Sequence, residues 1–224
     1  IGDVPLVCLP ADHVIQNEVG FSAVISEAIQ IATEKNELVL IGITPTAPEI
    51  GYGYIQRGEA CAESPNAYSV HRFVEKPDLA TALSYLQSGD YIWNSGMFVW
   101  RPTVILSAIR EFLPELEIEI GNAVQGILSG DDSAVVSSYD KLRSVSIDVG
   151  VLEKAENVVV LPTLALGWSD VGSWNSYAEC CGIMSGDGSS VQGQGVCVDS
   201  NGSMVISESD RFVALVGIDN CIVV

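Results

Sequence analysis

The strongest constraint on the fold is a strand–helix–strand pattern at the start of the chain. A short apolar run at residues 6–9 ends at Pro10, and a second continuous apolar run covers residues 38–43, as in strands buried on both faces. Between them, apolar residues recur at helical spacing over residues 21–32. A helical connection of this length favours parallel strands joined by a right-handed crossover. The sequence therefore predicts an α/β sheet.

Later segments extend this pattern and then change it. We expect strands at 53–56, 69–74 and 158–161 and a loop at 167–174. A helix is expected at 79–88, with Asp78 as its N-cap and Gly89 just beyond its end. Further helices are expected at 103–112 and, loosely connected, over 115–140. From Ser189 onward, short apolar runs separated by Gly, Asn or Asp predict strands at 196–198, 204–206, 212–216 and 221–224. We therefore expect an α/β domain over residues 1–186 and the start of a β-rich region over 187–224. Both are expected to be partial, since the chain begins with Ile1 and stops within an apolar run.

The charge balance argues against nucleic acid as a partner. The formal net charge is −19, and the ten Lys and Arg residues are spread along the chain instead of forming a basic stripe. Hydrophobic residues make up 48% of the sequence, enough for a large core. No apolar run approaches the roughly 18–20 residues that span a bilayer, and no signal segment is recognisable. We therefore expect a soluble, cytoplasmic chain with no membrane partner. Its six cysteines lack CxxC spacing, so we expect them to be buried, reduced thiols.

Two aspartates are candidates for metal binding. Asp12 follows a predicted strand, where open α/β sheets place their ligands, although an Asp in such a loop is often only a turn or cap residue. Asp170 lies between Trp168 and Trp174, which either anchor the loop on the core or hold the carboxylate for a ligand. Two separated carboxylates could hold Mg²⁺, because this ion completes its octahedron with phosphates and water.

Three further residues could contact a substrate. Glu75 and Lys76 lie at the end of a predicted strand. Because neighbouring side chains on a strand point to opposite faces, we expect no simple salt bridge between them, and we expect one of the two to face a cleft. The alternative is a solvated strand end. Asn94 stands near Gly96 before an apolar strand, which suits sugar hydroxyls but also an ordinary turn. In so acidic a chain, an anionic substrate needs a metal and a local cation such as Lys76.

Five segments carry a family resemblance. In chain order they are PADHVI at 10–15, GYGYI at 51–55, FVEKP at 73–77, WNSGMF at 93–98 and GWSDVGSW at 167–174. Together they resemble bacterial mannose-1-phosphate guanylyltransferases, also called GDP-mannose pyrophosphorylases, from about residue 3 to the C-terminus. The resemblance implies a Rossmann-like nucleotidyltransferase domain, truncated at its N-terminus and followed by the start of a β-rich region. It also implies the reaction of GTP with mannose 1-phosphate to give GDP-mannose and pyrophosphate, a nucleotide-sugar step of polysaccharide biosynthesis.

The same resemblance assigns roles to individual residues. Asp12 and Asp170 would be the Mg²⁺ ligands, and Lys76 would bind the phosphate of mannose 1-phosphate. Glu75, Asn94 and the Tyr52–Gly53 segment would hold the sugar. These roles agree with phosphoryl-transfer chemistry, in which positioning and charge neutralisation dominate.

One departure from the family and several alternatives stay open. The glycine-rich segment with an Arg and a Lys that grips the triphosphate precedes the first motif in this family and is missing here, so we predict that the 224-residue chain alone is inactive. A metal-dependent glycosyltransferase would instead release a nucleoside diphosphate from a nucleotide sugar. A non-catalytic regulatory homologue would only bind sugar nucleotides. The sequence also leaves open a following mannose-6-phosphate isomerase domain and a homo-oligomeric state.

Overall fold

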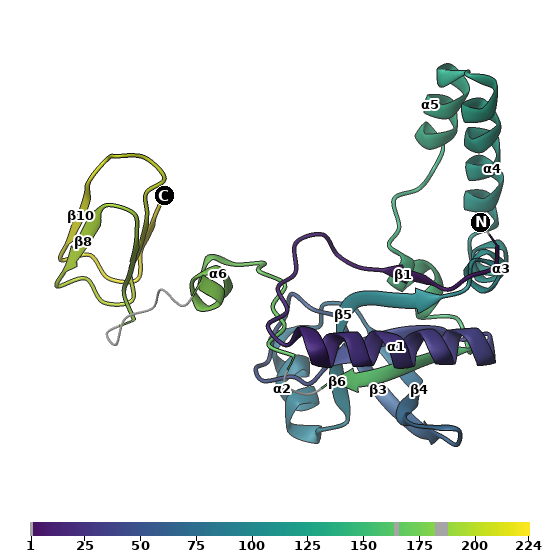
Figure 1. The fold of residues 1–224 in the computed structure, drawn as a ribbon, viewed down its shortest axis with the longest axis horizontal. Helices are drawn as coiled ribbons and strands as arrows, with labels where there is room; N and C mark the ends of the chain where they lie inside the picture. Colours follow the sequence, from purple (N-terminus) through teal and green to yellow (C-terminus); the bar gives the residue numbers. More distant parts are fainter. Residues whose placement is uncertain (1, 164–165, 182–187) are drawn as a thin grey trace. The chain divides into compact units, whose positions relative to one another are not determined.

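The computed structural model describes residues 2–163, 166–181 and 188–224, which divide into two units (Figure 1). Unit 1 comprises Ile1–Pro10 and Asn17–Leu166, and unit 2 comprises Ala11–Gln16 and Gly167–Val224. A short N-terminal loop therefore belongs to the same unit as the C-terminal region. The boundary that we predicted at 186/187 lies outside the described residues and stays a prediction.

Unit 1 is built on a six-stranded mixed sheet in the order β1-β5-β2-β6-β4-β3. The strands are β1 Leu6–Cys8, β2 Leu38–Ile43, β3 Tyr54–Cys61, β4 Ser64–Val74, β5 Tyr91–Trp100 and β6 Val158–Thr163. Strand β2 pairs in parallel with β6, whereas β5 is antiparallel to both β1 and β2 and lies between them. The predicted α/β class is confirmed, and β1 and β2 do run in the same direction, but they are not neighbours.

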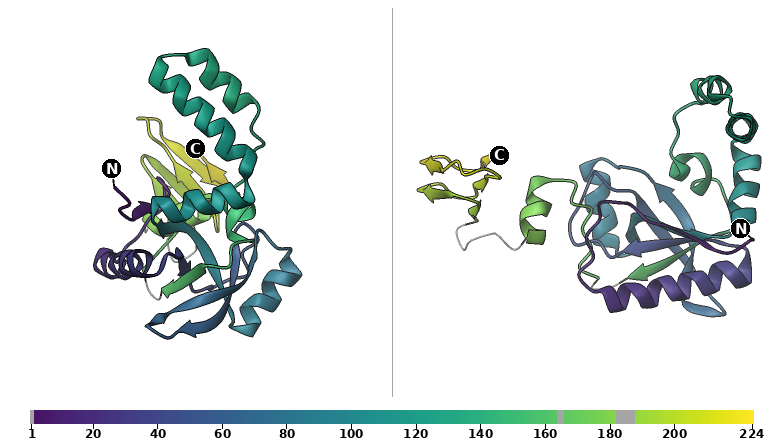
Figure 2. Two further views of the ribbon diagram at one scale, coloured as in Figure 1. Left: turned by 90° about the vertical axis from the view of Figure 1, so that its right-hand side faces the viewer. Right: turned by 45° about the horizontal axis from the view of Figure 1, so that its top comes forward.

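Unit 1 has helices over the segments where we expected them, together with a π-helix that we did not predict. They are α1 Glu18–Lys35, α2 Leu79–Ser88, α3 Pro102–Phe112, α4 Pro114–Ser129, α5 Asp132–Asp140 and the π-helix η1 Asp148–Leu152. The Asp78 carboxylate caps α2 by accepting the Thr81 N–H at 2.8 Å, and Gly89 ends the helix at φ 73°, as predicted. Helices α4 and α5 pair as a helical hairpin (Figure 2). Within the described ranges, none of the helices combines the length and the apolarity that crossing a bilayer requires.

The core of unit 1 is centred on β2, whose six residues are all buried. Its Leu38 and Leu40 join one hydrophobic cluster with side chains from β5, β6 and η1, including Phe98, Val160 and Val151. Fully burying each such side chain stabilises a fold by about 1.5–3 kcal/mol. This packed sheet supports the residues of the unit 1 site described below.

Strand β5 was only partly foreseen. The segment at 93–98, which we expected to lie ahead of a strand, is inside β5, and a β-bulge separates the pairs Leu40↔Phe98 and Gly42↔Asn94. The Ser95 hydroxyl holds the bulge by donating to the Ile41 carbonyl at 2.6 Å. Bulges often lie next to functional sites, and the paired residue on one side of this bulge is Asn94.

Unit 2 contains a helix and short parallel strands. These are α6 Trp174–Cys181, β7 Ser190–Gln192, β8 Gly195–Val198, β9 Met204–Ile206, β10 Val213–Val216 and β11 Ile222–Val223. Strands β7, β9 and β11 form one parallel row and β8 and β10 another, as in a chain that winds in successive coils (Figure 2). Ala178 of α6 packs against Met204 and Ile206 of β9. The expected β-rich character is confirmed, with β7 as a strand that we did not predict.

Candidate active site

Unit 1 brings together the five residues that we predicted to contact the sugar phosphate. The N–H of Lys76 donates to the carbonyl of Tyr52 at 3.2 Å, and the N–H of Asn94 donates to the carbonyl of Gly53 at 2.8 Å. These two bonds hold the end of β4 and the middle of β5 against the segment that leads into β3. Glu75 lies between Lys76 and Val74, the last residue of β4.

Gly53 is buried and makes room for the carboxylate of Glu75. A Cβ atom at residue 53 would lie 2.6 Å from Glu75 Oε2, 3.2 Å from the Phe73 ring and 3.3 Å from the Asn94 Cβ. Each of these distances is shorter than ordinary van der Waals contact. The glycine is therefore needed for close packing and not for an unusual backbone angle.

The predicted absence of a salt bridge between Glu75 and Lys76 was wrong. Lys76 Nζ lies 3.6 Å from Glu75 Oε1. Strand β4 ends at Val74, and Lys76 has φ 47°, so strand alternation no longer governs the direction of its side chain. The Lys76 side chain is 63% exposed and that of Glu75 is 30% exposed, so the ammonium group is accessible to an anion. An ion pair this exposed contributes little to stability.

Asp148 is a member of this site that sequence reasoning missed. The Asn94 side chain donates from Nδ2 to Asp148 Oδ1 at 2.9 Å, and its Oδ1 accepts the N–H of Gly96 at 3.2 Å. Asp148 opens the π-helix η1, where the Glu153 N–H donates to the Asp148 carbonyl at 2.9 Å. Single π-turns are frequent at functional sites. An acid inside the otherwise largely apolar run at 145–152 was the available signal.

Burial and neighbouring groups perturb the carboxylates of this site. Burial raises the pKa of Glu75, the charges of Asp148 and Glu153 raise it further, and Lys76 acts in the opposite direction. Burial likewise raises the pKa of Asp148, against hydrogen bonds from its own N–H, from Asn94 and from Ser146. Paired titratable groups with displaced pKa values are typical of functional sites.

Unit 2 holds the two predicted metal ligands close to one imidazole. An antiparallel bridge joins Val14 to Ser169 through N–H···O bonds of 2.9 and 3.0 Å, so the loops that carry Asp12 and Asp170 lie side by side. Burial lowers the pKa of His13, and the charges of Asp12 and Asp170 both oppose that shift. The two carboxylates are thus near the same histidine, although they are far apart in sequence.

The tryptophan before Asp170 anchors its loop through that histidine. Trp168 Nε1 donates to His13 Nδ1 at 3.1 Å, and the two rings meet edge to face with centroids 5.3 Å apart. The Asp170 carboxylate accepts the N–H of Gly172 at 3.1 Å. These contacts support the anchoring role of Trp168, while presentation of Asp170 to a ligand stays a prediction.

The carboxylates of Asp12 and Asp170 could bind a hard cation whose remaining coordination positions are filled by substrate or water. Among the residues that the structure describes, no group of three or more His, Cys, Asp or Glu side chains is arranged to hold a metal. A pair of carboxylates with a neighbouring neutral histidine is instead compatible with Mg²⁺, which takes one or two carboxylates together with substrate phosphates.

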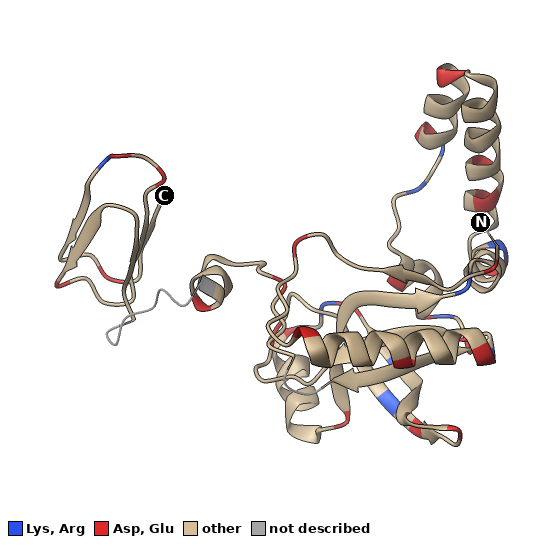
Figure 3. Cartoon of the chain, in the orientation of Figure 1, with Lys and Arg blue, Asp and Glu red and all other residues tan. Residues whose placement is uncertain are grey.

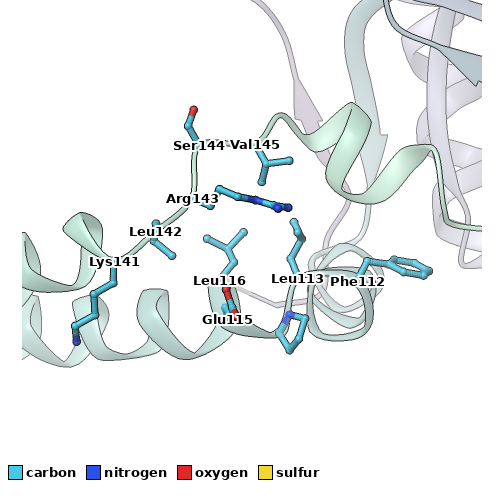
Figure 4. Close-up of a pocket in the computed structure, with 10 residues that line it drawn as sticks. Phe112, Leu113, Glu115, Leu116, Lys141, Leu142, Arg143, Ser144 and Val145 are labelled. Atoms are coloured by element: carbon cyan, nitrogen blue, oxygen red, sulfur yellow. The ribbon is translucent and has the colours of Figure 1, made fainter.

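Two hollows in the described part of the chain are lined by residues other than those of unit 1 described above. A hollow of about 460 Å³ lies between Phe112–Leu116 and Lys141–Val145, with Leu113, Leu116 and Arg143 facing it (Figure 4). A smaller hollow of about 230 Å³ in unit 2 is lined by residues 171–174 and Tyr177, next to Asp170. Lysines and arginines are few and dispersed over the elements, whereas acidic groups are frequent (Figure 3).

Comparison with known families decides the classification. The family model described as nucleotidyl transferase matches residues 2–183, most of the chain. The chain belongs to the nucleotidyl transferase family. Its α/β fold with a central mixed sheet agrees with the Rossmann-like fold that we expected.

Individual relatives refine this classification. The chain is 42% identical over 228 residues to the xanthan biosynthesis protein XanB of Xanthomonas campestris pv. campestris strain B100, covering 100% of this chain and 46% of XanB. It is 40% identical over 227 residues to a mannose-1-phosphate guanylyltransferase of Escherichia coli, covering 100% of this chain and 47% of that protein. The chain thus spans about half the length of the curated relatives it matches.

A solved structure supports the fold. A protein of Thermus thermophilus described as a mannose-1-phosphate geranyltransferase matches 96% of this chain and 61% of its own with a TM-score of 0.79 and 33% identity. A protein of Helicobacter pylori described as a mannose-6-phosphate isomerase matches 74% of this chain and 63% of its own, with a TM-score of 0.62 and 25% identity.

Proposed function

We propose that the whole protein transfers a guanylyl group from GTP to mannose 1-phosphate, giving GDP-mannose and pyrophosphate. The single observation that carries this proposal is the convergence of Tyr52, Gly53, Glu75, Lys76 and Asn94 in unit 1 of a nucleotidyl transferase. Relatives named mannose-1-phosphate guanylyltransferase supply the identities of sugar and base. We further propose that the reaction takes place in the cytoplasm.

The chain's own residues position the acceptor phosphate. The exposed ammonium of Lys76 binds this phosphate and neutralises part of its charge, as a point charge on a flexible stem. Asn94 and Glu75 offer a hydrogen-bond donor and an acceptor to sugar hydroxyls, while the backbone at Tyr52 and Gly53 fixes their spacing. A phosphate oxygen of the sugar phosphate then attacks the α-phosphorus of GTP in line with the departing pyrophosphate, and positioning lowers the barrier.

Asp12 and Asp170 would hold Mg²⁺ in this proposal. When bound, the ion neutralises phosphate charge that a chain of net charge −19 otherwise repels. Trp168 and His13 keep the Asp170 loop beside the Asp12 loop through their mutual hydrogen bond.

Two measurements test the proposal. In the whole protein, we expect GTP and mannose 1-phosphate to yield pyrophosphate and GDP-mannose in a Mg²⁺-dependent assay. In the 224-residue chain, we expect calorimetry to detect mannose 1-phosphate binding without turnover. Release of a free nucleoside diphosphate from GDP-mannose would instead favour a glycosyltransferase, and binding of sugar nucleotides by the whole protein without any turnover would favour a regulatory role.

A further inference from the structure

We propose that Asp148 is a positioning residue that acts through Asn94 and thereby sets the hydrogen-bond pattern offered to the sugar. This inference rests on the proposed function and deepens it. Nδ2 of Asn94 carries two hydrogens, and one of them is committed to Asp148 Oδ1 at 2.9 Å. The other hydrogen is the donor that we assign to a sugar hydroxyl.

The orientation of the Asn94 amide is fixed from both ends. Its Oδ1 accepts the N–H of Gly96 at 3.2 Å, and an ionised Asp148 can only accept, so it requires Nδ2 on its side. Rotating the amide by half a turn would place two donors face to face at Gly96 and two acceptors face to face at Asp148. The β-bulge of β5 and the π-turn of η1 provide the two anchors.

Asp148 is also placed to act on this site from a distant part of the chain. It is separated from Asn94 by 54 residues, and it lies near enough to Glu75 to raise the pKa of that carboxyl group. The groups that act on Asp148 itself are its own N–H, Asn94, Ser146 and Lys76. The site therefore offers the sugar a fixed N–H from Asn94 beside the carboxylate of Glu75, a pattern suited to neighbouring hydroxyls of a hexose phosphate.

A double-mutant cycle separates a positioning role from a direct contact. We expect Asp148→Ala to weaken mannose 1-phosphate binding about tenfold, since one anchoring hydrogen bond is lost. In the Asn94→Ala background the same substitution should cost almost nothing, because Asp148 acts through Asn94. Equal losses in both backgrounds would overturn the proposal.

Conservative variants guard against simple misfolding. Asp148→Asn can still accept from Asn94 through its amide oxygen, so we expect binding within about threefold of the unmodified chain. The exchange Asn94→Asp with Asp148→Asn keeps a hydrogen bond between the two side chains but removes the side-chain N–H donor at residue 94. It should fold normally and lose sugar-phosphate binding about tenfold. Retained binding in this exchanged variant would contradict the proposal.

A ligand-free readout separates this inference from the proposed function. In NMR spectra of the chain, the two Nδ2 hydrogens of Asn94 should give distinct, slowly exchanging signals that collapse or shift strongly in Asp148→Ala. The charge control Glu153→Ala should leave them unchanged, because Glu153 is exposed and affects Glu75 only through its charge. Unaltered Asn94 signals in Asp148→Ala would overturn the positioning role. Absence of mannose 1-phosphate binding by the unmodified chain would overturn the proposed function instead.

Discussion

Replacing Gly53 by alanine tests whether the sugar-phosphate residues depend on close packing. The matched control is Gly51→Ala, two residues away, because a Cβ at residue 51 meets nothing within 4 Å. Neither glycine has a positive φ, so both substitutions change the backbone preferences in the same way. Any difference between the two variants therefore reports on side-chain space.

The structure sets the size of the effect. The new Cβ at residue 53 would lie 2.6 Å from Glu75 Oε2, the flexible end of its side chain, which can rotate away. The Phe73 ring at 3.2 Å and the Asn94 Cβ at 3.3 Å are buried or held by hydrogen bonds and must shift by a few tenths of an ångström. Overpacking of this kind costs about 1–3 kcal/mol. The displaced carboxylate and amide should weaken mannose 1-phosphate binding more than tenfold.

Urea unfolding and calorimetry on the two variants measure both effects. We expect Gly53→Ala to lose stability and binding, and Gly51→Ala to change neither appreciably. Unchanged binding in Gly53→Ala would refute the reasoning, since it would mean that Glu75 and Asn94 need not keep their present positions. Equal losses in both glycine variants would point to a backbone conformation that alanine does not tolerate instead of side-chain packing.

Three further predictions address charge. Lys76→Ala should lower the use of mannose 1-phosphate by the whole protein on the order of 10²-fold, by analogy with lost electrostatic donors. The control Lys141→Ala removes an exposed ammonium group paired with Glu119 and should not lower it. Equal kinetics for both variants would mean that Lys76 is only part of a solvated strand end. Asp170→Asn should abolish Mg²⁺-dependent turnover of the whole protein without lowering its melting temperature, and full activity would reject the metal role. For Glu75, whose pKa is raised in the folded state, the favourable contribution is present below about pH 4 and is lost as the pH rises through the folded-state pKa. In urea titrations, the free energy of unfolding of Glu75→Gln should therefore rise relative to that of the unmodified chain between pH 4 and pH 7. A difference between the two that is constant with pH would contradict this assignment.

Local signals predicted those elements whose ends carry their own chemistry. Helix α2 has an Asp N-cap and a Gly beyond its last residue, and both ends were placed correctly. Strand β2 is buried on both faces, so its continuous apolar run was sufficient. In each case the information lies within about ten residues of sequence.

The parts that sequence reasoning missed depend on distant neighbours. The Asn94–Gly96 segment is composed of turn-forming residues, but its pairing with β2 makes it a bulged strand. Asp148 belongs to the site because it accepts from Asn94, which is 54 residues away. The Glu75–Lys76 pair was misjudged because the left-handed backbone at Lys76 was not visible in the sequence.

The joining of the Asp12 and Asp170 loops has a consequence for how the chain folds. His13 and Trp168 are 155 residues apart, and closing a flexible loop of that length costs about 4–5 kcal/mol in chain entropy. Within unit 1, the N–H of Asn17 donates to the carbonyl of Leu166 at 3.0 Å, and this contact closes most of the same loop. Once this contact of unit 1 has formed, the remaining entropy cost of bringing together the loops that carry Asp12 and Asp170 is therefore much smaller.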